Sequence, residues 1–227
     1  MSEKVKILVV IPALEGPKAE NSACLATYWG EHKYPSVIHY VSDTYIHMAR
    51  NRAMVMAADL KATHLMFIDS DMTFPKWGVD RLVEQNKLII GGLYFGRRTP
   101  LPVVLKVNDE TKKLEIYKDV PQYDEPYETD AVGTGFMLIK TEAFSHIQPP
   151  FFSYSNPKEF ELVPNPFPGN EVGEDVYFCL KARKAGLKVW VDPTIPLGHV
   201  GKRIYTRTDY EAYHKNGHAD LYTEKLY

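Results

Sequence analysis

The chain has 227 residues, of which 44% are hydrophobic and 25% charged, and its formal net charge is −2. These values are typical of a soluble domain with a large core and lack the basic balance of nucleic-acid-binding domains. No run of about 18 apolar residues occurs, so we expect no membrane span. The apolar stretch 7–13 is too short for a signal peptide. Cys24 and Cys179 form no CxxC motif, which favours a reducing, cytoplasmic location.

The first 95 residues alternate short apolar runs with helical patterns. Val5–Pro12 (VKILVVIP) is a continuous β-branched run, as in a strand buried on both faces of a parallel sheet. A loop containing Gly, Pro and Asn follows it. The pattern then predicts strands at 37–41, 64–68 and 88–93 and helices at 42–60 and 76–86, the longer helix being capped by Ser42 or Asp43. Such alternation predicts βαβ units and a mostly parallel sheet.

After residue 96 the rhythm changes. Val103–Val107 and Lys113–Tyr117 flank a turn-like segment, which predicts a small antiparallel hairpin. Ala131–Ile139 is interpreted as one strand opened by glycines. Gln148–Gly173 is rich in proline, phenylalanine and tyrosine, which is typical of a binding loop or lid. The last predicted elements are a helix and a strand, at 174–185 and 188–191.

Two carboxylates follow the third predicted strand directly, in Asp69-Ser70-Asp71. Ligands of open α/β sheets bind beyond the carboxyl ends of the strands. Two acids at such a place repel each other, and a divalent ion such as Mg²⁺ or Mn²⁺ relieves the repulsion and then binds phosphate oxygens. The alternative is a solvated turn or a helix cap, which Asp and Ser also favour.

A second acidic pair, Glu174-Asp175, begins the helix predicted at 174–185. The helical wheel places Asp175 among apolar residues and points Glu174 outward. An inward carboxylate at a helix N-terminus is well placed to be a general base for an acceptor hydroxyl. The alternative is that both acids only complement the helix dipole.

Four further places are candidates for binding. His199 follows the last predicted strand and is either a ligand of a Mn²⁺-type ion or structural. Gly133-Thr134-Gly135 permits close approach of a ligand to the backbone, or forms a bulge. Arg50 lies at the margin of its helix's apolar stripe, where it neutralises a diphosphate or pairs with Asp43 or Asp69. Arg97-Arg98 contacts phosphate or acceptor, or forms a solvated turn.

The order of these motifs resembles that of GT-A glycosyltransferases, particularly the family-2-like group. That family has a nucleotide-binding first strand, a DxD, a glycine loop, an xED and a late metal-binding histidine. The chain offers, in this order, Pro12, Asp69 with Asp71, Gly133–Gly135, Gly173-Glu174-Asp175 and His199, and Arg50-Asn51 about twenty residues before the DxD is also similar. The resemblance spans about residues 5 to 201.

The resemblance implies a single GT-A domain with a Rossmann-like, mostly parallel sheet. Residues 1–95 would be the nucleotide-binding half, 96–201 the sugar and acceptor half with a lid loop, and 202–227 a tail. The implied activity is transfer of a sugar from a UDP- or GDP-sugar to an acceptor hydroxyl, with Mn²⁺ or Mg²⁺ as cofactor. The implied acceptor is a glycan or a hydroxymethylated DNA base of the bacteriophage type, in which case the cytoplasm is that of the host cell.

The resemblance also implies a role for each motif residue. Asp71 and His199 would bind the metal, and Asp69 would contact the ribose or the metal. Asp175 would be the base of an inverting reaction. The remaining implied contacts are to the nucleotide (Pro12, Asp43), to the diphosphate (Arg50), and to sugar and acceptor (Gly133, Thr134, Gly135, Glu174).

Two other functions compete with this one. Residues 69–73 also satisfy DxDxT, the motif of haloacid-dehalogenase-type phosphatases, in which Asp69 is the nucleophile and Asp71 an acid/base. That motif normally ends the first strand of its domain, whereas two strands and a helix precede it here. The second alternative is a non-catalytic binder of nucleotide sugars with the same fold.

Overall fold

The computed structural model of the chain describes residues 4–13, 16–42, 44–97, 100–117, 124–163, 172–201 and 204–215. Its helices are α1 (Ala19–Glu31), α2 (Ile46–Asp59), α3 (Gly78–Glu84), α4 (Glu174–Lys184) and α5 (Arg207–Lys215), with 3₁₀ turns η1 (Thr141–His146) and η2 (Pro157–Phe160). Its strands are β1 (Ile7–Pro12), β2 (Ser36–Val41), β3 (His64–Ile68), β4 (Met72–Thr73), β5 (Ile89–Gly92), β6 (Val104–Val107), β7 (Leu114–Ile116), β8 (Tyr127–Thr129), β9 (Ala131–Val132), β10 (Phe136–Lys140), β11 (Val189–Asp192), β12 (Gly198–Val200) and β13 (Ile204–Tyr205).

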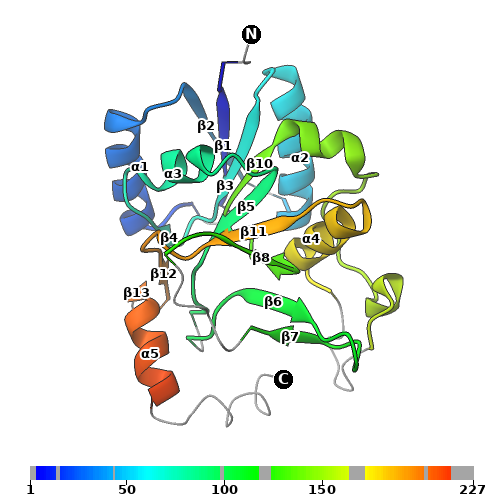
Figure 1. Cartoon of the computed structure of the whole chain (residues 1–227). Coiled ribbons are helices and arrows are strands. Elements are labelled where there is room, and N and C mark those ends of the chain that lie inside the picture. The colour runs from blue at the N-terminus through cyan, green and yellow to red at the C-terminus, as the bar shows by residue number, and fades with distance from the viewer. Residues whose placement is uncertain are drawn as a thin grey trace.

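A mixed, mostly parallel sheet forms the centre of the molecule (Figure 1). Among the described residues it has seven strands in the order β2-β1-β3-β10-β5-β11-β8. β1 pairs in parallel with β2 and β3, and β5 pairs in parallel with β11, whereas β10 and β8 run against their neighbours. The predicted α/β fold class is therefore confirmed.

Helices cover both faces of this sheet. Along β1, Leu8 and Val10 contribute to a core shared with α2 and α4, while Ile7, Val9 and Ile11 contribute to a core shared with α1 and α3. Successive side chains of a strand point to opposite faces, so a strand covered on both faces has to be apolar throughout. Figure 1 shows α1 and α3 on one side of the sheet and α2 and α4 on the other.

Two small sheets flank the central one, within the part of the chain that the structure describes. One has the order β7-β6-β9, and its β6–β7 pair confirms the predicted antiparallel hairpin. The other has the order β13-β12-β4 and joins the segment after the DxD to the last third of the chain. In the predicted tail, α5 stacks Tyr210 on Phe95, with ring centroids 5.3 Å apart.

Three predicted elements differ from the structure. The loop expected after β1 contains α1, whose N-terminus at Lys18 has no side-chain cap and so lacks a sequence signal. α2 begins at Ile46, after an N-cap at Tyr45 without a side-chain hydrogen bond, so capping by Ser42 or Asp43 was wrong. The single strand expected at 131–139 is two strands, β9 and β10, in different sheets.

No helix in the described ranges combines the length and the apolar character needed to cross a bilayer.

Candidate active site

The DxD turn lies at the carboxyl end of β3 and is held by its own backbone contacts. The amide of Asp69 donates to the carbonyl oxygen of Gly135 at 2.9 Å, because β10 starts beside the end of β3. From α1, Asn21 Nδ2 donates to the carbonyl oxygens of Asp69 (3.2 Å) and Met72 (2.8 Å), and the Lys18 amide donates to that of Ser70 (2.8 Å). The first turns of α1 therefore fix the backbone that carries the two acids.

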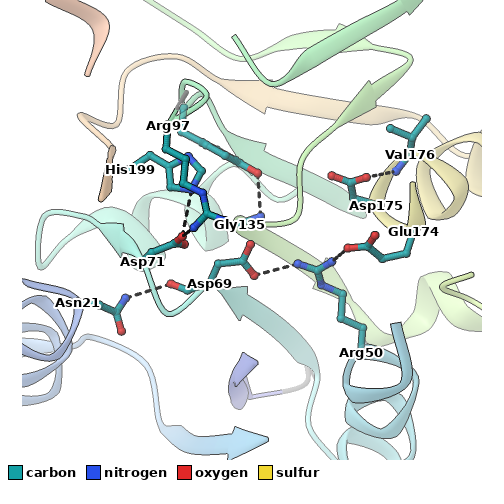
Figure 2. A network of polar contacts seen from close by, with 11 residues as sticks. Asn21, Arg50, Asp69, Asp71, Arg97, Gly135, Glu174, Asp175, Val176 and His199 are labelled. Carbon is teal, nitrogen blue, oxygen red and sulfur yellow. Dashed lines mark hydrogen bonds and ion pairs between the residues drawn. The ribbon is translucent and has the colours of Figure 1, made fainter. Parts of the chain in front are cut away.

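Arg50 bridges Asp69 to Glu174. Its guanidinium donates to Asp69 Oδ1 through Nη2 at 2.8 Å and to Glu174 Oε1 through Nη1 (Figure 2). The Arg50 side chain is only 2% exposed, so its charge is almost fully removed from water. Burial raises the pKa of Asp69 above its usual range, although the guanidinium opposes the shift. Two ion-pair partners were suggested for Arg50. The structure shows the pair with Asp69, and Asp43 lies outside the described residues.

Asp71 and His199 face each other where two neighbouring strands, β4 and β12, pair. The register of β12 on β4 pairs His199 with Met72, the residue after Asp71. His199 Nε2 lies 3.4 Å from Asp71 Oδ2, and His199 Nδ1 lies 3.0 Å from the carbonyl oxygen of Phe95. Since a carbonyl oxygen only accepts, Nδ1 carries a proton and Nε2 is left as the nitrogen facing the carboxylate. This arrangement fixes a histidine ring for metal binding in many proteins.

Arg97 is a second cation at Asp71. Its Nη1 donates to Asp71 Oδ2, the same oxygen that faces the imidazole of His199 (Figure 2). Burial alone raises the pKa of Asp71. The neighbouring imidazole and guanidinium outweigh burial and hold this pKa below its usual range. Asp71 is therefore ionised at neutral pH and available to a cation.

Asp175 lies in the first turn of α4, and its Oδ1 accepts from the Val176 amide at 2.7 Å. Burial, reinforced by the charge of Glu174, raises the pKa of Asp175 to about 6. A carboxyl with this pKa is poised to exchange a proton near neutral pH. The prediction that Glu174 points outward was wrong, since its side chain is 12% exposed and paired with Arg50.

The glycine loop is shaped by a protein side chain. The amide of Gly135 donates to Tyr94 Oη at 3.2 Å. A Cβ on Gly133 would lie 2.0 Å from Tyr94 Oη, and one on Gly135 would lie 2.9 Å from Tyr94 Oη and Cζ. Both glycines therefore allow the tyrosine to approach the backbone, where close approach by a ligand had been expected.

The other predicted residues lie around this centre. Pro12 ends β1 beside Val41 of β2 and is partly buried. Thr134 is 1% exposed, and its buried hydroxyl has no hydrogen-bond partner among the described residues. Arg98 lies, like Asp43, outside the described residues. Sequence reasoning missed Asn21 and Tyr94, whose roles depend on a helix and a turn that the sequence pattern did not predict.

The donor atoms at Asp71 and His199 fit a hard divalent ion, since carboxylate oxygen and imidazole nitrogen both bind Mn²⁺. Across the residues that the structure describes, no three histidine, cysteine or acidic side chains converge on one point. The structure brings together two of the three expected ligands, Asp71 and His199. The third, Asp69, is directed to Arg50 (Figure 2).

Comparison with known proteins supports the fold. No protein-family model and no curated protein matches the sequence. The crystal structure of A197 from STIV has the same fold, with a TM-score of 0.58, 18% identity, and coverage of 87% of this chain and 86% of that chain.

Two more distant solved structures are similar at TM-scores below 0.5. TarS from S. aureus matches with a TM-score of 0.45 and 13% identity over 82% of this chain and 58% of that chain. A UDP-glucose pyrophosphorylase complexed with UDP-glucose matches with a TM-score of 0.46 and 10% identity over 94% of this chain and 100% of that chain.

Proposed function

We propose that the chain is a glycosyltransferase that uses a divalent ion, Mn²⁺ or Mg²⁺, to bind a UDP- or GDP-sugar and transfers the sugar to an acceptor hydroxyl. The observation that carries the proposal is the pair formed by Asp71 and His199, with Nε2 and Oδ2 3.4 Å apart. A carboxylate oxygen and an imidazole nitrogen at this distance can bind one divalent cation together. The resemblance of the motif order to GT-A glycosyltransferases agrees with this.

The charge of the site supports the same conclusion. Among the described residues its acids are Asp69, Asp71, Glu174 and Asp175, and its arginines are Arg50 and Arg97. When all four acids are ionised, two negative charges remain uncompensated. A diphosphate would be repelled by such a site unless a divalent ion came with it.

Asp71 and His199 would hold the metal, and water and donor phosphate oxygens would complete its coordination. When bound, the ion acts as a Lewis acid that offsets the charge developing on the leaving diphosphate. Arg50 has both amino groups engaged by carboxylates, so it acts by orienting Asp69 and Glu174.

Asp175 would be the general base. It takes the proton of the acceptor hydroxyl while the hydroxyl oxygen bonds to the anomeric carbon and the bond from that carbon to the diphosphate oxygen breaks. With a pKa of about 6, Asp175 is mostly ionised at pH 7 and still basic enough to accept a proton. Attack on the face opposite the leaving group inverts the anomeric centre.

Calorimetry with UDP and GDP, each with and without Mn²⁺, tests the donor site. We expect metal-dependent binding that Asp71→Ala and His199→Ala abolish. Asp130→Ala is the matched control, because Asp130 also pairs with an arginine, Arg183, and its side chain is 17% exposed against 13% for Asp71. Equal nucleotide binding without metal would refute the metal role, and phosphate release from monoesters that depends on Asp69 would favour the phosphatase.

Mass spectrometry of candidate acceptors, incubated with the donor that binds best, tests the transfer step. Glycans and hydroxymethylated DNA are the two classes to include. We expect Asp175→Asn to bind donor normally and to transfer no sugar. Full transfer by this variant would remove Asp175 as the base.

A further inference from the structure

The two arginines of the site differ in how firmly they are held. The Arg50 side chain is 2% exposed and binds two carboxylates, whereas the Arg97 side chain is 53% exposed and its one ion pair is with Asp71 among the described residues. Because the Arg97 side chain is half exposed, its guanidinium can exchange the carboxylate for water more easily than a buried arginine can. Arg50 is therefore a fixed part of the structure, and Arg97 is free to leave its carboxylate.

The segment 94–97, which carries Arg97, also contacts His199. Tyr94 lies edge-on to the imidazole of His199, with ring centroids 5.6 Å apart, and the Phe95 carbonyl oxygen holds His199 Nδ1. A Cβ on Gly201 would lie 3.1 Å from the Cβ and the carbonyl oxygen of Arg97, so the chain after His199 packs closely on this segment. The backbone of Arg97 is thus fixed beside the site while its side chain is half in solvent.

Arg97 and His199 compete for a single oxygen. Both approach Asp71 Oδ2, where Figure 2 shows them converging. A divalent ion bound to this oxygen and to His199 Nε2 would be within a few ångströms of the guanidinium, and like charges at that distance repel strongly. The guanidinium and the metal therefore exclude each other at Asp71.

We propose that Arg97 occupies the metal position of the donor-free protein and moves to the donor diphosphate when the metal–nucleotide complex binds. This inference rests on the proposed function and adds a residue to it. While the site is empty, Arg97 neutralises Asp71. Once displaced, its planar guanidinium would bind the donor phosphates in bidentate fashion, since the Arg97 backbone stays beside the site.

The exchange predicts effects of opposite sign for one substitution. Arg97→Ala removes a competitor of Mn²⁺ and should tighten the binding of Mn²⁺ alone by about three- to tenfold. The same change removes a phosphate ligand and should weaken the binding of UDP or GDP in saturating Mn²⁺ by about ten- to a hundredfold. If Arg97 were only structural, its substitution would weaken the binding of both Mn²⁺ and nucleotide. If Arg97 only repelled the metal, its substitution would strengthen both.

Electron paramagnetic resonance of free Mn²⁺ measures the first effect and calorimetry with Mn²⁺ and UDP or GDP the second. Arg97→Gln is a second variant that keeps side-chain length. Arg183→Ala is the matched control, since it removes an arginine of 39% exposure from an ion pair with Asp130 and should change neither constant. Thermal unfolding verifies that each variant is folded.

Unchanged or weaker Mn²⁺ binding by both Arg97 variants, or unchanged or tighter nucleotide binding, would overturn the exchange. Failure of the proposed function gives a different result. In that case wild-type protein with Mn²⁺ binds neither UDP nor GDP, and the movement of Arg97 to a diphosphate fails with it.

Discussion

Replacement of Asp175 by asparagine should stabilise the protein while it removes the transfer activity. The pKa of Asp175 is raised from its ordinary value of 3.8 to about 6, chiefly by burial and then by the charge of Glu174. The folded protein therefore binds this proton more tightly than the unfolded chain does, and stability falls as pH rises through the window between the two values. Asparagine keeps the acceptor for the Val176 amide without the charge.

The magnitude follows from the shift. A difference of about 2 pKa units corresponds to about 3 kcal/mol once the carboxyl is ionised in both states. At pH 8 the asparagine variant should gain at most this amount in the free energy of unfolding. At pH 4.5 the unfolded carboxyl is ionised but the folded one is not, so the gain falls to about 1 kcal/mol. Asp175 is partly exposed, so the measured values should lie below these limits.

Urea unfolding of the wild-type protein and Asp175→Asn at both pH values measures the gain. Glu110→Gln, in the exposed turn between β6 and β7, is the control and should show no pH-dependent gain. In parallel, the transfer rate of the wild-type protein should rise with pH through about 6. A variant that is equally or less stable than wild type at pH 8 would refute the account of Asp175 as a carboxyl strained by burial.

Three further substitutions test the contacts around the site. Arg50→Met leaves two partly buried carboxylates without their counterion and should lower the free energy of unfolding by up to about 3–5 kcal/mol, against about 1 kcal/mol or less for the exposed Arg183→Met, as measured by urea unfolding. Gly133→Ala places a Cβ 2.0 Å from Tyr94 Oη and should cost about 1–3 kcal/mol in the same assay, part of which Tyr94→Phe restores. Asn21→Ala removes both side-chain donors that hold the DxD turn, so Mn²⁺-dependent nucleotide binding in calorimetry should weaken by about tenfold.

The buried half of the fold was predictable because its signal is local. The run that forms β1 is apolar at every position, since helices cover both faces of the sheet, and β3 has the same character. α1 was not predictable in this way. It begins without a side-chain cap, and it buries Asn21, Leu25 and Tyr28, a set that includes a polar residue and interrupts the apolar stripe.

In the candidate site, too, the residues with a local sequence pattern were predictable and the long-range contacts were not. Asp69, Asp71 and His199 were found because acids after a strand and a histidine after the last strand are local patterns. The contacts that organise them come from residues remote in sequence: Asn21 in α1, and Tyr94, Phe95 and Arg97 after β5. In this segment the sequence marks only Arg97 as a candidate, because the contacts of Phe95 and Arg97 depend on the pairing of β12 with β4 and that of Tyr94 on the turn before β10.

The orientation of Glu174 shows where helical periodicity stops being informative. A helical wheel assumes that each side chain projects outward from the helix axis. Side chains in fact tilt toward the N-terminus of the helix, and in the first turn no preceding turn lies beneath them. Glu174 is the first residue of α4, so its long side chain extends past the helix end and reaches Arg50 on α2.

The positive end of the helix dipole favours both acids of this turn. The N-terminus of α4 thus directs Glu174 to the buried arginine and leaves Asp175, one residue on, as the acid without a cationic hydrogen-bond partner among the described residues. That difference in pairing is why we assign proton transfer to Asp175 and positioning to Glu174.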